Sequence, residues 1–455
     1  GCSSALSAGG WWRPVIQEEA AQASLVVVER CTTRLRVAFT SLRTLLTLVL
    51  FAVTLAAVVL RPRGIAAGWW TCGAAAIALA AGLVHPGEVW ALVLVAKEAL
   101  LFLLALLLLS ALLEASGFFE WAAVLAARSA RSGAALLRNV LLLGALITIV
   151  LSLDTTAVIL TPLVVAAVQR LEVPARPYVL VCVFVSNVAS LLLPVSNLTN
   201  LLLAAHVPPA RFAAAMALPQ LLVLLVLWGG LRLACRRELA VSLDTELLPR
   251  AATVVADRPF FLAACVVLVL LVLGYFVGPA LGAPVWLTTF AGVGVLAAVG
   301  LARRRFGRNG VHHLSLGVFP FVVGLFALVQ AVENLGLARP LVRWLAEPRP
   351  PFLELGAIAG VASISSSALN NLPATLLMRS VLGALQAPER GMHAALLGTN
   401  IGSCLTPHGT LATLLVLAAA ARRGVDLPPL EVVKVALWLV PVMLVAGLLG
   451  LWAVG

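Results

Sequence analysis

A carboxylate stands between two apolar stretches of this chain, at Asp154 in the segment Ser-Leu-Asp-Thr-Thr that spans 152–156. A carboxylate at membrane depth is costly, and where one occurs it usually binds or moves an ion or a proton. The structural alternative is a fixed carboxylate that Thr155, Thr156 and backbone N–H groups satisfy. We expect Asp154 to be functional.

Four short polar clusters interrupt the apolar sequence, at 153–156, 194–200, 365–373 and 406–410. Irregular polar backbone is tolerated in a bilayer only where it is buried in protein or lines a cavity. Half-helix ends offer N–H groups to an anion or a neutral polyol, while carbonyl, amide and hydroxyl oxygens bind cations. The expected substrate- or ion-binding residues in these clusters are Asp154, Thr155, Ser196, Asn197, Asn200, Asn370, Asn371, Thr406, Gly409 and Thr410. Four polar residues just upstream of two of the clusters are added to the set: Asn187, Ser190, Asn400 and Ser403.

Proton coupling is expected at Asp154 and His408, because a histidine inside a helix break could carry a proton. For Asn187 and Asn400 a structural role stays open, in which they bond across the molecule and hold two interrupted helices together.

An internal duplication is indicated by the segment 186–202, which aligns without gaps on 399–415. Further landmarks recur upstream in the same order: Asp154 and Asn371, then the segments 114–117 and 333–336. The informative matches inside the aligned segments are Asn187 with Asn400, Ser190 with Ser403, and Pro194 with Pro407.

The composition predicts the surroundings of these residues, since 62% of the 455 residues are hydrophobic and only 11% are charged. A soluble domain carries about 25% charge, so this surface must face lipid. Apolar runs of about 20 residues recur, and the shorter alternating pattern of a β-barrel does not. The net charge of +12 comes mainly from arginines in short loops, which favours the positive-inside bias over nucleic-acid binding. We expect an all-α polytopic membrane protein without a nucleic-acid partner.

The order of apolar runs predicts the division of the chain. Basic loops at 236–258 and 303–313 are expected in the cytoplasm, so the two copies would have opposite orientations. This inverted-topology repeat, with two re-entrant hairpins and two broken helices, is typical of secondary transporters. It leaves one conflict, because it places the arginines of 30–43 outside. The expected units are an N-terminal extension (1–42), an extra first span (43–64), transport repeat 1 (65–235, hairpin 135–170, broken helix 178–203), a cytoplasmic linker plus extra span (236–283), and transport repeat 2 (284–455, hairpin 353–384, broken helix 393–417).

Enzyme chemistry finds no support in the sequence, which has no GxSxG, HExxH or Walker A motif. The seven cysteines are scattered without metal-ligand spacing, so we expect no metal and no cofactor. A non-transporting membrane module is the alternative of another class, and the polar clusters argue against it.

At these residues the chain resembles the arsenite/antimonite efflux permease family, the arsenical pump membrane proteins, within the wider ion-transporter superfamily. The resemblance runs from about Arg61 to Gly455, and at the first hairpin tip the usual Asn-Asp pair reads Leu153-Asp154. The motifs that carry it are GFFEW (117–121), DTTAVILTP (154–162), SNLTN (196–200), LNNLP (369–373) and LTPHGTLATLL (405–415).

The resemblance implies a secondary transporter that exports arsenite or antimonite, driven by protons through Asp154. The preference for arginine over lysine and the richness in alanine and leucine suggest a GC-rich bacterial genome, so we expect the inner membrane. The expected substrate is the neutral trihydroxide, which hydroxyls and amides can bind. A separate arsenite-stimulated ATPase and a second copy of the chain are the implied partners. Two alternatives remain on the same fold: a sodium/proton antiporter and an anion/sodium symporter, which sodium dependence would reveal.

Overall fold

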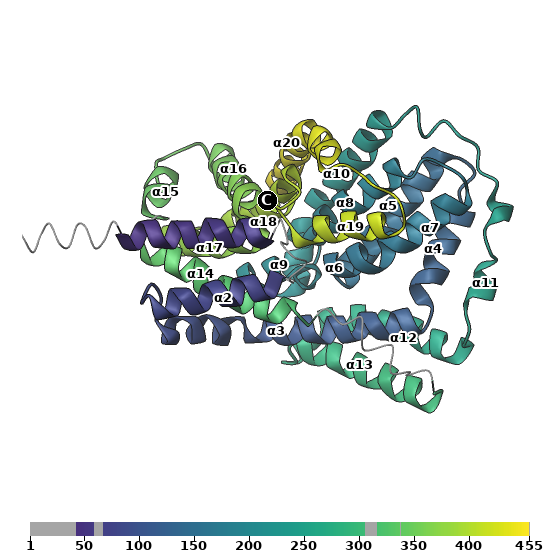
Figure 1. Cartoon of the computed structure of the whole chain (residues 1–455), viewed down its shortest axis with the longest axis horizontal. Helices are drawn as coiled ribbons and strands as arrows, with labels where there is room; N and C mark the ends of the chain where they lie inside the picture. Colours follow the sequence, from purple (N-terminus) through teal and green to yellow (C-terminus); the bar gives the residue numbers. More distant parts are fainter. Residues whose placement is uncertain (1–41, 59–66, 305–315, 337, 455) are drawn as a thin grey trace, which may run out of the picture.

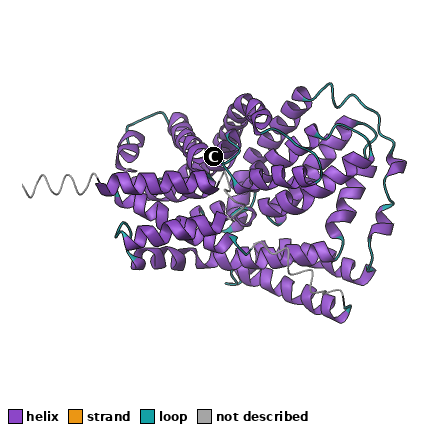
Figure 2. Ribbon diagram, viewed as in Figure 1, coloured by secondary structure: helices purple, strands orange, loops and turns teal. Residues whose placement is uncertain are grey.

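The structure is a computed structural model that describes residues 42–58, 67–304, 316–336 and 338–454. Within these residues all regular elements are helices, joined by turns and loops (Figure 2). The single β contact there is an isolated bridge between Ser132 and Ser242. The predicted all-α architecture is confirmed. The expected extension 1–42 lies outside the described residues, except for Leu42 at the start of the first described helix.

Eight helices in the described part are long and apolar enough to cross a membrane, so the chain is a multi-pass membrane protein. A ninth span results if α14 (Val318–Asn334) and α15 (Ala338–Leu345), whose axes differ by 71°, count as one. Shorter apolar helices lie at Leu42–Val58, at Arg176–Leu191, at Leu411–Arg422 and in α2 (Ala67–Ala80). The eight are α3 (Pro86–Ala115), α5 (Gly133–Val150), the run Leu153–Arg170, α10 (Pro209–Ala234), α12 (Arg258–Ala280), α13 (Val285–Ala302), α16 (Pro351–Leu369) and α20 (Pro429–Val454).

Capping residues set where several of these helices begin. Ser132 starts α5 by accepting a hydrogen bond from the backbone of Ala135, and Asp257 does the same for α12. Gly117 and Gly336 have φ of 79° and 69°, which suits glycine at the end of a helix. Each of these glycines turns the chain from a long helix into a short one, α4 (Phe118–Arg128) after α3 and α15 after α14.

The helices form two groups (Figure 1). In the first, α14 packs on α2 and α3, and α13 packs on α3 and α12. In the second, α10 packs on α20 and α16 packs on α18 (Glu389–Gly402). The short helix α9 (Leu198–Leu203) lies between the groups and contacts α3 as well as α17 (Asn371–Leu385). The polar cluster at 194–200, which contains the start of α9, therefore lies at the boundary between the two groups of helices.

Ion pairs tie the starts of four helices together within the second group. Arg176, at the start of α8 (Arg176–Val188), lies 3.1 Å from Glu431 at the start of α20. Arg211, near the start of α10, lies 2.7 Å from Glu389 at the start of α18. Arg176 also lies 2.6 Å from Glu238, beyond the end of α10.

Candidate functional site

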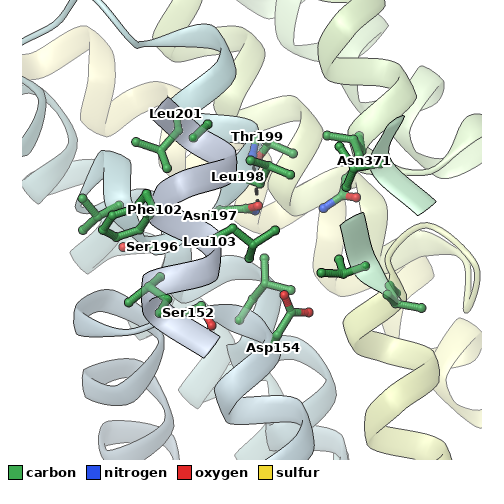
Figure 3. Close-up of a pocket in the computed structure, with 18 of the residues that line it drawn as sticks. Phe102, Leu103, Ser152, Asp154, Ser196, Asn197, Leu198, Thr199, Leu201 and Asn371 are labelled. Carbon is green, nitrogen blue, oxygen red and sulfur yellow. Dashed lines mark hydrogen bonds between the residues drawn. The ribbon is translucent and has the colours of Figure 1, made fainter. Parts of the chain in front are cut away.

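A cavity of about 70 Å³ lies at the boundary between the two helix groups (Figure 3). α3 and α14 contribute apolar lining residues, with Phe102, Leu103 and Phe321 among them. The polar lining side chains come from the interrupted helices and include Asp154 and Asn371. The volume holds a few water molecules, so it suits a solute of a few non-hydrogen atoms.

The first polar cluster positions Asp154 at the start of a helix. Ser152 caps the short helix α6 (Leu153–Thr155) by accepting a hydrogen bond from the backbone N–H of Thr155. The chain then continues through one π-helical turn (Thr156–Leu160) into α7 (Thr161–Arg170). A π-helical turn inside an α-helical run often marks a functional site.

The carboxylate of Asp154 has no hydrogen bond or ion pair with any described residue, and it points into the cavity (Figure 3). The structural alternative needed Thr155 and Thr156 to hold it, but both hydroxyls are engaged elsewhere. Thr155 Oγ1 lies 2.8 Å from Ser110 Oγ of α3, and Thr156 Oγ1 lies 2.8 Å from Thr148 Oγ1. An unpaired carboxylate in a small cavity is costly, which favours a role in binding.

The second hairpin tip, between α16 and α17, is fastened to a helix break. Asn370 donates from Nδ2 to the carbonyl of His408 at 2.9 Å, and the N–H of Asn371 donates to the carbonyl of Gly409 at 2.8 Å. Asn370 has φ 86° and ψ 153°, a region that side chains rarely adopt and that costs about 1–3 kcal/mol. These bonds hold the strained residue in place, and the side-chain amide of Asn371 lines the same cavity as the carboxylate of Asp154 (Figure 3).

The first helix break follows α8, which ends in a 3₁₀ turn (Ala189–Leu191). A second 3₁₀ turn (Pro194–Ser196) leads to Asn197, whose Oδ1 caps α9 by accepting from the N–H of Thr199 at 3.2 Å. Ser196 donates from Oγ to the carbonyl of Ile149 at 2.7 Å, so the break is fixed to the end of α5.

The second break follows α18, which also ends in a 3₁₀ turn (Ser403–Leu405). Thr406 donates from Oγ1 to the carbonyl of Ser367 at 2.7 Å, and Thr410 caps α19 (Leu411–Arg422). Gly409 passes so close to the Ser403 carbonyl that any Cβ would collide with it, so only glycine fits there. The side chain of His408 forms no hydrogen bond with the described residues, whereas its carbonyl receives the bond from Asn370.

Asn400, in α18, is the centre of a buried network behind the cavity. Its Oδ1 accepts from Asn197 Nδ2 at 2.7 Å, and its Nδ2 donates to Asn200 Oδ1 at 3.0 Å. Weaker contacts reach the same Oδ1 from Ser190 and Thr199 at 3.5 and 3.4 Å. Since a satisfied buried network specifies one arrangement, Asn400 fixes α9 against α18.

The aligned residue Asn187 is bonded differently. Its Nδ2 donates to Thr413 Oγ1 at 3.2 Å, but its Oδ1 has no partner among the described residues. Neither asparagine bonds to the other. Each asparagine does form a hydrogen bond with the other half of the chain, which is the structural role expected for the pair.

The cavity therefore collects only part of the predicted set: Asp154, Ser196, Asn197, Asn370 and Asn371 line it. The sequence did not single out Ser152 and Thr199, which also line it, or the aromatic residues Phe102 and Phe321. Ser152 could have been found as the capping residue before Leu153. The predicted residues that do not line the cavity are Thr155, Asn187, Ser190, Asn200, Asn400, Ser403, Thr406, His408, Gly409 and Thr410.

The described residues contain no candidate metal site, because no three histidine, cysteine, aspartate or glutamate side chains lie close enough together to hold a metal ion. Cys404 is buried beside Asn400, and its Sγ lies 3.9 Å from that residue's carbonyl. It does not line the cavity.

Comparison with known proteins agrees with this architecture. The arsenical pump membrane protein of Yersinia enterocolitica is 31% identical over 394 residues, which cover 83% of this chain and 91% of that protein. The protein of the same description from Escherichia coli K12 is 31% identical over 397 residues, with the same coverage. An uncharacterized transporter of Mycobacterium tuberculosis is 27% identical over 412 residues, covering 84% of this chain and 92% of that protein.

Among solved structures, the YdaH transporter of Alcanivorax borkumensis has a similar fold, with a TM-score of 0.52 at 20% identity. The likeness covers 78% of this chain and 84% of that one. The family described as arsenical pump membrane protein matches residues 46–454, which is nearly the whole chain. Together with the identity to its members, this match means that the chain belongs to the arsenical pump membrane protein family.

Proposed function

We propose that this protein exports trivalent arsenite, and by the same chemistry antimonite, across the bilayer in exchange for protons. Family membership supports arsenite as the substrate. The observation that carries the proposal is the cavity that the unpaired carboxylate of Asp154 and the amide of Asn371 both line. In this account Asp154 alternately holds substrate and a proton.

The neutral trihydroxide of arsenic matches this cavity in size and in hydrogen-bonding groups. Its three hydroxyls can donate to the carboxylate of Asp154 and both donate to and accept from the amide of Asn371. Phe102 and Phe321, which also line the cavity, exclude water, which strengthens these bonds. A site built to bond hydroxyl groups rejects analogues that lack them, because its polar groups would stay unpaired.

We also propose that the two halves form an inverted-topology repeat, and the hydrogen bonds around the aligned asparagines support this. Asn187 donates to the carbonyl of Val183, one turn back in its own helix, and Asn400 does the same to Leu396. Each asparagine also donates to the third residue after the cap of the other half's second helix. These acceptors are Thr413 for Asn187 and Asn200 for Asn400.

Further equivalent features extend this correspondence along the chain. Ser190 and Ser403 each donate to the carbonyl of the asparagine that precedes them, at 2.7 and 2.9 Å. Asn197 and Thr410, which also align, cap α9 and α19. The left-handed glycines at 117 and 336 end corresponding long helices.

The ion pairs at the helix starts are equivalent as well, but with the charges exchanged. Extending the gapless alignment pairs Arg176 with Glu389, and the starts of α10 and α20 pair Arg211 with Glu431. Hence one half contributes Arg176 to Glu431, and the other contributes Glu389 to Arg211. In the proposed transporter the hairpin tips enter from opposite sides and meet at the cavity, so that either side can open to it in turn.

The test is arsenic content in cells that lack their own efflux system. We expect cells expressing this chain to hold severalfold less arsenic than cells with an empty vector, and a protonophore to remove the difference. If arsenic content is unchanged while tolerance to sodium or lithium rises, the sodium/proton antiporter replaces this proposal.

A further inference from the structure

A second cavity, of about 480 Å³, lies at the end of α10, away from the candidate site. Three arginines line it: Arg131 before α5, and Arg232 and Arg236 at the end of α10. None of the three forms an ion pair with a carboxylate of the described residues. The cavity therefore concentrates uncompensated positive charge, and its natural ligand is an anion.

Two carboxylates that lie near this cavity in the sequence, at positions 238 and 244, have partners of their own. Glu238 lies 2.6 Å from Arg176 in an ion pair, and Asp244 accepts a hydrogen bond from the backbone of Glu246 at 3.0 Å. Neither forms an ion pair with the three arginines, whose guanidinium groups stay open to an external anion.

The walls of the cavity are fixed by backbone hydrogen bonds. The linker after α10 runs against the turn before α5, with Gly133 N–H donating to Val241 O at 3.0 Å and Leu243 N–H to Arg131 O at 3.3 Å. Arg128 holds the next part of the linker through a 2.6 Å bond from Nη1 to the carbonyl of Leu248. A pocket fixed in this way loses little conformational entropy when it binds a ligand.

The position of the cavity in the membrane decides which anion fits. Leu221 and Leu225 of α10 are 53% and 51% exposed, so this face of the helix meets lipid. Arg232 lies at the end of that face, with its guanidinium 5.5 Å from the ring centre of Trp228. Arginine and tryptophan at the end of an apolar span mark the level of the lipid headgroups.

We propose that this arginine pocket, formed by Arg131, Arg232 and Arg236, binds the phosphate of an anionic phospholipid. The acyl chains of that lipid lie along Leu225 and Leu221. Basic pockets at the ends of membrane helices are suited to lipid headgroups, and each arginine contributes about a fivefold gain in affinity. The apolar face leading to the pocket favours a lipid over soluble phosphate.

The experiment measures how much phosphatidylglycerol the purified full chain retains, by native mass spectrometry, in mixed micelles with phosphatidylcholine. We expect the triple variant Arg131→Gln, Arg232→Gln, Arg236→Gln to bind phosphatidylglycerol about a hundredfold more weakly than the wild type. The matched control replaces Arg237, Arg422 and Arg423 by glutamine; these exposed arginines do not line the pocket, and their loss should change little.

Equal retention by the triple variant and the wild type would overturn the proposal. So would displacement of the lipid from the wild type by millimolar inorganic phosphate, which would make the pocket a site for a soluble anion. If the triple variant does not fold, the single variants Arg131→Gln and Arg236→Gln decide the matter, since each should lose about fivefold.

Discussion

Replacing Asp154 by asparagine is expected to impair proton-coupled arsenite export strongly while the protein stays folded. Asparagine keeps the size of the side chain but cannot ionise, so it can neither hold a proton nor make charge-assisted bonds to substrate. The fold should tolerate the change, because the carboxylate has no hydrogen bond to lose among the described residues. A hydrogen bond to a charged group contributes about 1.5–3 kcal/mol, so we expect the export rate to fall by at least roughly tenfold.

The measurement is the initial rate of arsenite uptake into everted membrane vesicles, normalised to the amount of protein in the membrane. The matched control is Glu98→Gln, which removes an exposed carboxylate of α3 that does not line the cavity. If Asp154→Asn transports as fast as the wild type, the carboxylate has no part in transport. If Glu98→Gln is equally impaired, the loss does not arise in the cavity.

Replacing Asn400 by leucine is expected to destabilise the protein far more than the same change at Asn187. Leucine at position 400 leaves Asn197 Nδ2 and Asn200 Oδ1 without their partner in α18. A buried polar group without its partner costs about 1–3 kcal/mol, so two such groups cost about 2–6 kcal/mol. At Asn187 only the bond to Thr413 crosses to the other half, and Oδ1 is already without a partner.

Thermal unfolding of the two variants in the same detergent measures this difference. We expect Asn400→Leu to melt at a clearly lower temperature than Asn187→Leu, and Asn187→Leu to stay near the wild type. Equal decreases in melting temperature would mean that the two asparagines stabilise the protein equally, which would contradict the hydrogen-bond network of the structure.

The positions where the helices are interrupted could be predicted from the sequence, because prolines and polar residues are tolerated at membrane depth for few reasons. The helices are interrupted after Ala189–Leu191 and after Ser403–Leu405. Each interruption contains one of the aligned prolines, Pro194 or Pro407. The re-entrant course of the hairpins and their entry from opposite sides remain predictions. They depend on where the bilayer lies, which packing within the protein does not decide.

The cavity could be predicted only in part. Asp154 and Asn371 could be identified because a polar side chain within apolar membrane sequence is costly and is usually functional. Phe102 and Phe321 could not be told from lipid-facing residues, because cavity wall and lipid contact are equally apolar. The unequal roles of Asn187 and Asn400 also escaped the sequence, since they depend on whether a long amide (Asn197) or a short hydroxyl (Thr410) stands at the facing helix cap.

The most direct test of arsenite export by this cavity uses proteoliposomes that contain only the purified chain. With an acidic lumen, we predict that wild-type vesicles accumulate arsenite above the outside concentration, that a protonophore releases it, and that Asp154→Asn vesicles accumulate none. Arsenite that never exceeds the outside concentration under this proton gradient, in vesicles of folded wild-type protein, would contradict proton-driven export by this chain alone.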